Sequence, residues 1–271
     1  MKWSVCTTGM KSHSLEWVLQ VFSRWRAEGA VLDGLDLWIG HVEDYSKCCI
    51  GGLGKLAERL RASHIHIPVI SGYTYFSDGA HGRNRDLEEF RKALQAAEIL
   101  GARAVRTFFG HLPSHRASPE LWDESLSALL QAVTLARAAG VEVWVETHYQ
   151  TFADHPQAVL ELMSAAGDEN LHIIYDAANF HVDGVDPLAA LSVLYPFVRH
   201  VHLKNYRWDH DCWYRSQPVS ALSRHGDVDN ISILRMLQQR GYSGYVSLEY
   251  FGARGWEALV QSLVECRSNP A

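Results

Sequence analysis

Four polar residues end four apolar segments in the second half of the sequence. The segments are "VEVWVE", "LHIIYD", "VRHVH" and "YVSLE", and they end in Glu146, Asp176, His202 and Glu249. Carboxylates and imidazole are ligands of divalent cations. Three carboxylates at one place would raise one another's pKa unless a cation compensated their charge. The pattern therefore predicts one divalent metal ion bound by these four residues.

The predicted ligands suggest both the metal and its chemistry. Three carboxylates with one imidazole favour Mn²⁺, with Mg²⁺, Zn²⁺ and Co²⁺ as alternatives. Such an ion polarises a carbonyl group of a keto sugar or cyclitol and acidifies the neighbouring C–H bond. Glu146 and Glu249 are the predicted catalytic pair, one taking a proton and the other returning it. The result would be isomerisation or epimerisation, or a dehydratase reaction if a β-hydroxyl group is expelled.

Five further residues are predicted to bind the substrate. His148 shares a strand face with Glu146, and Lys204 shares one with His202, because side chains alternate along a strand. His111 and Asn179 follow the ends of two other strands. Trp208 stands in a long segment, residues 205–228, that also carries other aromatic residues, namely Tyr206, Trp213 and Tyr214. A loop of this length is usually functional, and we expect it to cover a sugar ring or to form an oligomer interface.

Eight strand-like segments alternate with helix-like segments along the whole chain. This order predicts an α/β fold, a (β/α)₈ TIM barrel, with residues 1–271 as one domain. The strand ends of such a barrel meet at one mouth, which would bring the predicted ligands together. Glycines before the next strand predict helix ends at Gly29, Gly101, Gly140, Gly167 and Gly241. An open doubly wound sheet is the rival architecture, but no glycine-rich dinucleotide turn follows the first strand.

Charge and composition limit the classes of partner. The net charge is −6 and the pI about 6.2, which disfavours nucleic acid and anionic membranes. Five cysteines without a disulfide framework, and no long apolar run, favour a cytoplasmic protein. We therefore expect a small sugar or polyol as the substrate, with a homo-oligomer possible. A free sugar is favoured over a phosphosugar, because the sequence has no glycine-rich phosphate loop.

The segments "VEVWVETH", "IIYDAANF", "VRHVHLKN" and "GYSGYVSLEYF" resemble strands five to eight of the xylose isomerase-like barrel superfamily, the sugar phosphate isomerase/epimerase group. "GARAVRTFFG" is similar to the fourth strand of that family. The resemblance implies a metal held by Glu146, Asp176, His202 and Glu249. Three places depart from it: Asn179 replaces a histidine that many relatives carry, Asn205 replaces an aspartate, and "RHGDVD", residues 224–229, stands where the family often reads G-E-G. The substrate is therefore expected to differ from those of better-known members.

Two other functions remain open from the sequence. Abasic-site endonucleases share this barrel and use several zinc ions, and His66 and His111 are predicted at the ends of strands three and four. The acidic charge and Asn179 argue against a nuclease. A barrel that binds a sugar or a metal without turnover is the third possibility. His200 lies deeper than His202 and is predicted to be a core residue.

Overall fold

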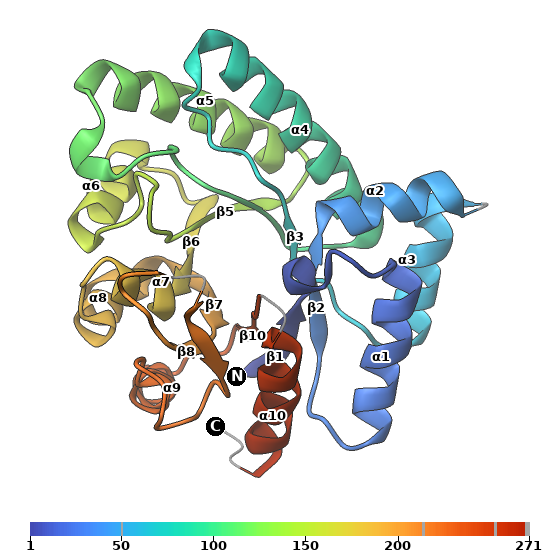
Figure 1. The fold of residues 1–271 in the computed structure, drawn as a ribbon. Coiled ribbons are helices and arrows are strands. Elements are labelled where there is room, and N and C mark those ends of the chain that lie inside the picture. Colours follow the sequence, from blue (N-terminus) through green and yellow to red (C-terminus); the bar gives the residue numbers. More distant parts are fainter. Residues whose placement is uncertain (50, 213–214, 252–253, 269–271) are drawn as a thin grey trace.

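The computed structural model describes residues 1–49, 51–212, 215–251 and 254–268. Its centre is a closed barrel of parallel strands in the order β1-β10-β7-β6-β5-β4-β3-β2 (Figure 1). The predicted (β/α)₈ barrel is therefore confirmed. The barrel strands are β1 (Lys2–Cys6), β2 (Gly34–Trp38), β3 (Val69–Ser71), β4 (Ala104–Thr107), β5 (Glu142–Glu146), β6 (Leu171–Asp176), β7 (Val198–Leu203) and β10 (Tyr245–Leu248).

Helices surround the barrel on its outside (Figure 1). They are α1 (Leu15–Ala27), α2 (Ile39–Cys48), α3 (Gly52–Ala62), α4 (Gly79–Leu100), α5 (Pro119–Ala138), α6 (Pro156–Ala166), α7 (Ala177–Val182), α8 (Pro187–Leu194), α9 (Asn230–Gln239) and α10 (Gly255–Ser268), with short 3₁₀ helices η1 (Thr7–Met10), η2 (Ser114–Arg116) and η3 (Tyr195–Phe197). In the described part of the chain, no helix has the length and apolar character needed to span a membrane.

Side chains of each barrel strand alternate between the helices and the barrel interior. On β5, Val143 and Val145 belong to the large core under the helices, whereas Trp144 packs inside the barrel. Glu146 follows the same alternation, so it faces the interior at the carboxyl end of its strand. The five glycines predicted to end helices all have positive φ, between 54° and 92°. They allow the left-handed turn that starts each connection to the next strand.

The long segment after β7 forms a hairpin rather than an open loop. Its strands β8 (Asn205–Arg207) and β9 (Gln217–Val219) pair antiparallel, and Tyr250 Oη donates to the carbonyl oxygen of Val219 at 2.7 Å. Trp213 and Tyr214 lie outside the described residues. The hairpin is therefore held against the residues that follow β10, at the carboxyl end of the barrel.

One predicted position is wrong. His66 precedes β3 and bridges to Gly34, the first residue of β2, while its Nδ1 lies 2.9 Å from the Tyr245 hydroxyl at the start of β10. It therefore lies at the amino-terminal end of the barrel, opposite the predicted mouth. The apolar run "IHIPVIS" made the strand look longer than the three residues that pair in β3. His66 therefore does not support the similarity to zinc-dependent abasic-site endonucleases.

Candidate active site

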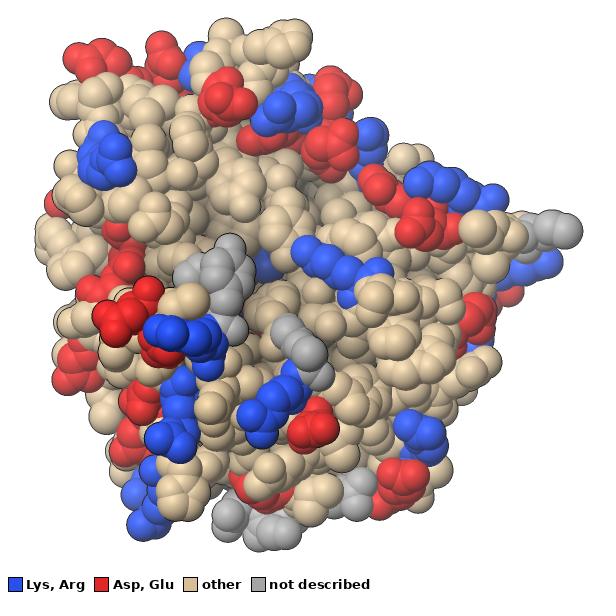
Figure 2. All heavy atoms as spheres, viewed as in Figure 1, with Lys and Arg blue, Asp and Glu red and all other residues tan. Residues whose placement is uncertain are grey.

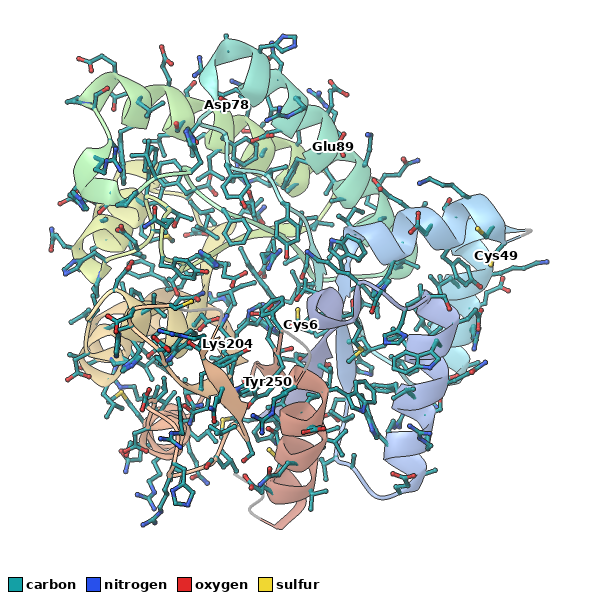
Figure 3. The ribbon with its side chains drawn as sticks, viewed as in Figure 1. Cys6, Cys49, Asp78, Glu89, Lys204 and Tyr250 are labelled. Atoms are coloured by element: carbon teal, nitrogen blue, oxygen red, sulfur yellow. The ribbon has the colours of Figure 1, made fainter. Side chains whose placement is uncertain are left out.

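The structure brings the four predicted metal ligands together inside the carboxyl end of the barrel. One oxygen each of Glu146, Asp176 and Glu249 and one ring nitrogen of His202 all lie within 4.8 Å of one another. Each of these side chains has an exposed fraction of 1 % or less. Figure 2 shows a depression with basic atoms in the middle of the face seen in Figure 1. Figure 3 places the labelled Lys204 near the barrel centre.

Asp176 is fixed by the start of the next helix. It ends β6 and caps α7, because its Oδ1 accepts hydrogen bonds from the backbone N–H groups of Ala178 and Asn179 at 3.0 and 3.1 Å. Capping of this kind satisfies amide groups that have no partner within the helix. Its other oxygen, Oδ2, lies 2.8 Å from Lys204 Nζ. Asp176 therefore has one oxygen bound to backbone and one directed into the site.

His202 has the geometry of a ligand. Its Nδ1 lies 3.5 Å from both Glu146 Oε1 and Glu249 Oε2. Burial lowers the pKa of His202, but the carboxylates of Glu249 and Glu146 outweigh burial and raise this pKa well above its ordinary value. Among the described residues neither ring nitrogen has a hydrogen-bond partner. A buried imidazole without a partner beside three carboxylates fits a divalent cation.

Two basic side chains compensate the charge of the carboxylates. Arg106 on β4 places its Nη1 2.6 Å from Glu146 Oε2, and Lys204 Nζ lies 3.0 Å from Glu249 Oε2. Burial raises the pKa of Glu146, yet Arg106 and His202 bring it down to about 2. Burial also raises the pKa of Glu249, but Lys204 outweighs burial and brings this pKa well below the usual range. Arg106 was not among the residues predicted from the sequence, although an arginine inside the apolar segment "AVRTFFG" was a signal.

Glu249 is also held by residues at the end of β1, the strand that pairs with β10. Its Oε1 accepts hydrogen bonds from the Thr8 hydroxyl at 2.9 Å and from Cys6 Sγ at 3.3 Å. Burial, followed by the Glu249 charge, raises the pKa of Cys6 to about 12. Cys6 is therefore a neutral donor rather than a thiolate nucleophile. With Lys204 on Oε2, both oxygens of Glu249 are engaged.

His148 lies in the loop after β5 with one ring nitrogen engaged. Its Nδ1 is 2.6 Å from the carbonyl oxygen of Tyr149, and since a carbonyl only accepts, Nδ1 carries the proton. The lone pair is therefore on Nε2. Burial lowers the pKa of His148, with Glu146 raising it and Lys204 lowering it. These interactions describe a neutral imidazole with a basic nitrogen, close enough to the site to respond to its charges.

The other predicted substrate residues differ in their surroundings. Asn179 is 4 % exposed, and its Nδ2 donates to the carbonyl oxygen of Thr147 at 3.0 Å, so this amide connects α7 to the end of β5. His111 is exposed, with Nδ1 2.5 Å from Ser77 Oγ. Trp208 is half-buried and packs on Tyr206, with ring centroids 4.8 Å apart. Of the five, Lys204 is the residue whose side chain contacts the ligand carboxylates, whereas Asn179 reaches Asp176 through its backbone N–H.

Aromatic rings form one wall of the site beside Arg106. The guanidinium carbon lies 4.7 Å from the ring centroid of Tyr73 and 4.8 Å from that of Phe108. Phe108 in turn stacks on Tyr75 and meets His148 edge to face, with centroids 5.0 and 5.1 Å apart. The wall therefore joins the loops after β3, β4 and β5. Tyr73 is the exposed ring of this wall, whereas Phe108 and Arg106 are buried.

Comparison with known proteins agrees with this geometry. The family model described as xylose isomerase-like TIM barrel matches residues 33–267. A 3-dehydroshikimate dehydratase from Bacillus anthracis is 26 % identical, over 96 % of this chain and 94 % of the relative.

Solved structures show the same fold. The crystal structure of a probable 3-DHS dehydratase from Bacillus anthracis has a TM-score of 0.87 and 22 % identity, with all of both chains covered. The IOLI protein, crystallised with zinc, has a TM-score of 0.81 and 18 % identity, with 99 % of this chain and 96 % of that chain covered. The curated relatives, which are named as dehydratases and isomerases, confirm the expectation that the chain is an enzyme.

Proposed function

Because the chain belongs to the xylose isomerase-like TIM barrel family, we propose that it is a metal-dependent enzyme that dehydrates a cyclic keto-polyol. The observation that carries this proposal is the buried group of Glu146, Asp176, His202 and Glu249, whose ligand atoms lie within 4.8 Å of one another. Similarity to a named dehydratase over 96 % of this chain favours dehydration over isomerisation.

The proposed ligands are those expected from the sequence. Three carboxylate oxygens and one imidazole nitrogen suit Mn²⁺ first, or Mg²⁺, with Zn²⁺ and Co²⁺ as alternatives. When bound, such an ion supplies the positive charge that polarises a substrate carbonyl and acidifies the C–H bond beside it. Lys204 is predicted to move from the carboxylates of Asp176 and Glu249 to a substrate oxygen when a cation shares their charge, because its ammonium is then less strongly held.

His148 is the proposed general base. Its Nε2 carries a lone pair because Nδ1 donates to Tyr149 O, and burial keeps the ring neutral. The sequence instead predicted Glu146 and Glu249 for proton transfer. Glu146 is paired with Arg106 on one oxygen, and both oxygens of Glu249 accept hydrogen bonds, so these contacts favour ligand roles for the two glutamates.

The proposed reaction is a β-elimination. His148 Nε2 takes the proton from the carbon beside the carbonyl, a carbon–carbon double bond forms, and the β C–O bond breaks. Lys204 gives a proton to the departing hydroxyl group, so the products are one unsaturated ketone and one water molecule. The exposed ring of Tyr73, which lies over Arg106, would face the increasingly planar substrate ring.

Turnover of a small panel of ketones tests this function. Metal-loaded protein is incubated with 3-dehydroshikimate, with an inosose and with a free ketohexose, and loss of water is followed by ultraviolet absorbance and mass spectrometry. We expect dehydration of a ring ketone, with a primary isotope effect when the proton beside the carbonyl is replaced by deuterium. An epimer or a ketose–aldose pair without loss of water would instead establish the isomerase reaction.

The role of His148 has a matched control. His148→Gln should lower kcat about 10²-fold or more with unchanged metal affinity. His155→Gln changes an exposed histidine of the same loop region, whose Nδ1 accepts from the Gln157 backbone N–H, and should leave kcat unchanged. Normal turnover by metal-loaded His148→Gln would contradict this role and would favour Glu146 and Glu249 as the residues that transfer the proton.

A further inference from the structure

Asp36 is a fully buried carboxylate in the middle of β2, outside the group of proposed metal ligands. Its exposed fraction is 0 %, and it interrupts the apolar run "GLDLW". Transfer of a charged carboxylate out of water is costly unless other groups compensate it. The residues that face Asp36 therefore indicate its role.

Two histidines of β7 face the same oxygen of Asp36. His200 Nε2 lies 2.7 Å from Oδ2, a hydrogen-bond distance, and His202 Nε2 lies 3.4 Å from it. The ring of His200 also stacks on Trp144, with centroids 5.4 Å apart and planes 21° apart. His200 therefore holds Asp36 in place from one side, while the carboxylate points toward the inner nitrogen of His202.

The outer nitrogen of His202 faces the metal ligands. Nδ1 lies 3.5 Å from Glu146 Oε1 and 3.5 Å from Glu249 Oε2. A carboxylate beside Nε2 keeps a proton on that nitrogen and leaves the lone pair of Nδ1 free for a cation. Among the ion pairs that His202 makes with described residues, the one at Nε2 is with Asp36.

We infer that Asp36 is a positioning residue that sets the ring orientation and the protonated nitrogen of His202, with His200 holding Asp36. The inference rests on the proposed function, because it requires a cation among the four ligands. Groups that support a ligating histidine in this way typically contribute 10- to 100-fold to metal affinity. The core role predicted for His200 is compatible with this arrangement, since its ring supports Asp36 and is not directed at the cation.

Calorimetric titration with Mn²⁺ tests the inference on the whole chain. Asp36→Asn keeps the shape of the side chain but presents an amide to the histidines, and it should weaken binding about 10- to 100-fold. The control is Asp86→Asn, which changes another buried carboxylate, 4 % exposed, whose Oδ2 accepts from Tyr75 and Phe76 backbone N–H groups at 2.8 Å. Its Mn²⁺ affinity should equal that of the wild type. Wild-type affinity in folded Asp36→Asn would overturn the inference.

Nitrogen NMR of the Zn²⁺-loaded wild type is a second test of the inference, and it does not depend on whether Asp36→Asn folds. The ¹⁵N signals that disappear in His202→Gln should belong to a ring with Zn²⁺ on Nδ1 and a proton on Nε2. Zn²⁺ on Nε2 would overturn the inference. If the wild type binds no divalent ion, both the proposed cation site and the positioning role of Asp36 are wrong. If the wild type binds Mn²⁺ and Asp36→Asn binds it equally well, only the positioning role is wrong.

Discussion

Replacing Arg106 with methionine is expected to destabilise the metal-free protein by about 3 to 5 kcal/mol. Arg106 is 1 % exposed, its Nη1 lies 2.6 Å from Glu146 Oε2, and its Nη2 donates to the carbonyl oxygen of Gly72 at 3.0 Å. Methionine fills much of the space beside Tyr73 and Phe108. It leaves the Glu146 carboxylate buried without its partner, and this accounts for most of the expected loss.

Urea unfolding in the presence of a chelator measures this loss. Glu146→Gln in the Arg106→Met background removes the unpaired charge and should recover about 2 kcal/mol or more. Arg103→Met is the matched control, because Arg103 directly precedes β4 and pairs with Glu142 of β5 at 2.9 Å, but its side chain is 61 % exposed. An exposed pair contributes about 1 kcal/mol or less.

Added divalent cation should also stabilise Arg106→Met more than the wild type, because the cation replaces the missing charge beside Glu146. An Arg106→Met loss as small as the Arg103→Met loss would refute the electrostatic role of Arg106. The electrostatic role would also be refuted if the losses in unfolding free energy of Arg106→Met and Glu146→Gln simply added in the double variant.

Three further predictions concern other parts of the barrel. Asp176→Ala should abolish divalent-cation binding in calorimetry, whereas His200→Ala should mainly lower the free energy of unfolding, and equal affinities would contradict this distinction. Burial lowers the pKa of His172 from 6.5 to about 4, so the unfolded chain takes up a proton first as the pH falls. Stability should therefore fall between about pH 6.5 and 4, by at most about 3 kcal/mol, and His172→Gln should flatten this pH dependence in urea unfolding; an unchanged curve would exclude His172. Trp208→Ala should raise KM or change sedimentation if the hairpin covers the substrate or joins subunits, and no change in either would remove both roles.

The sequence predicted the barrel and the meeting of four ligands because both follow from repeated patterns. Alternating strands and helices indicate the barrel, and in a parallel barrel the strand ends must share one mouth. Glu146 and Asp176 were therefore expected to be neighbours although they are far apart in the chain. Their compensation by Arg106 depends on side-chain directions across the barrel, which strand ends alone do not give.

Residues in the middle of strands were harder to predict. Asp36 and Arg106 lie within apolar runs, and strands of a parallel barrel are buried on both faces, so apolar residues do not tell which face is inward. His66 was misplaced for a related reason, since an apolar run continued beyond the paired strand. A charged residue at an alternate position of such a run was the available signal for both Asp36 and Arg106.

Anomalous X-ray scattering from crystals grown with Mn²⁺ tests the proposed site most directly. One ion is expected inside the carboxyl end of the barrel, ligated by Glu146, Asp176, Glu249 and the Nδ1 atom of His202. The Lys204 ammonium should then have moved from the carboxylates. Well-ordered crystals that show no anomalous density among these four side chains at saturating Mn²⁺, with Lys204 still paired to Asp176, would contradict the proposed metal site.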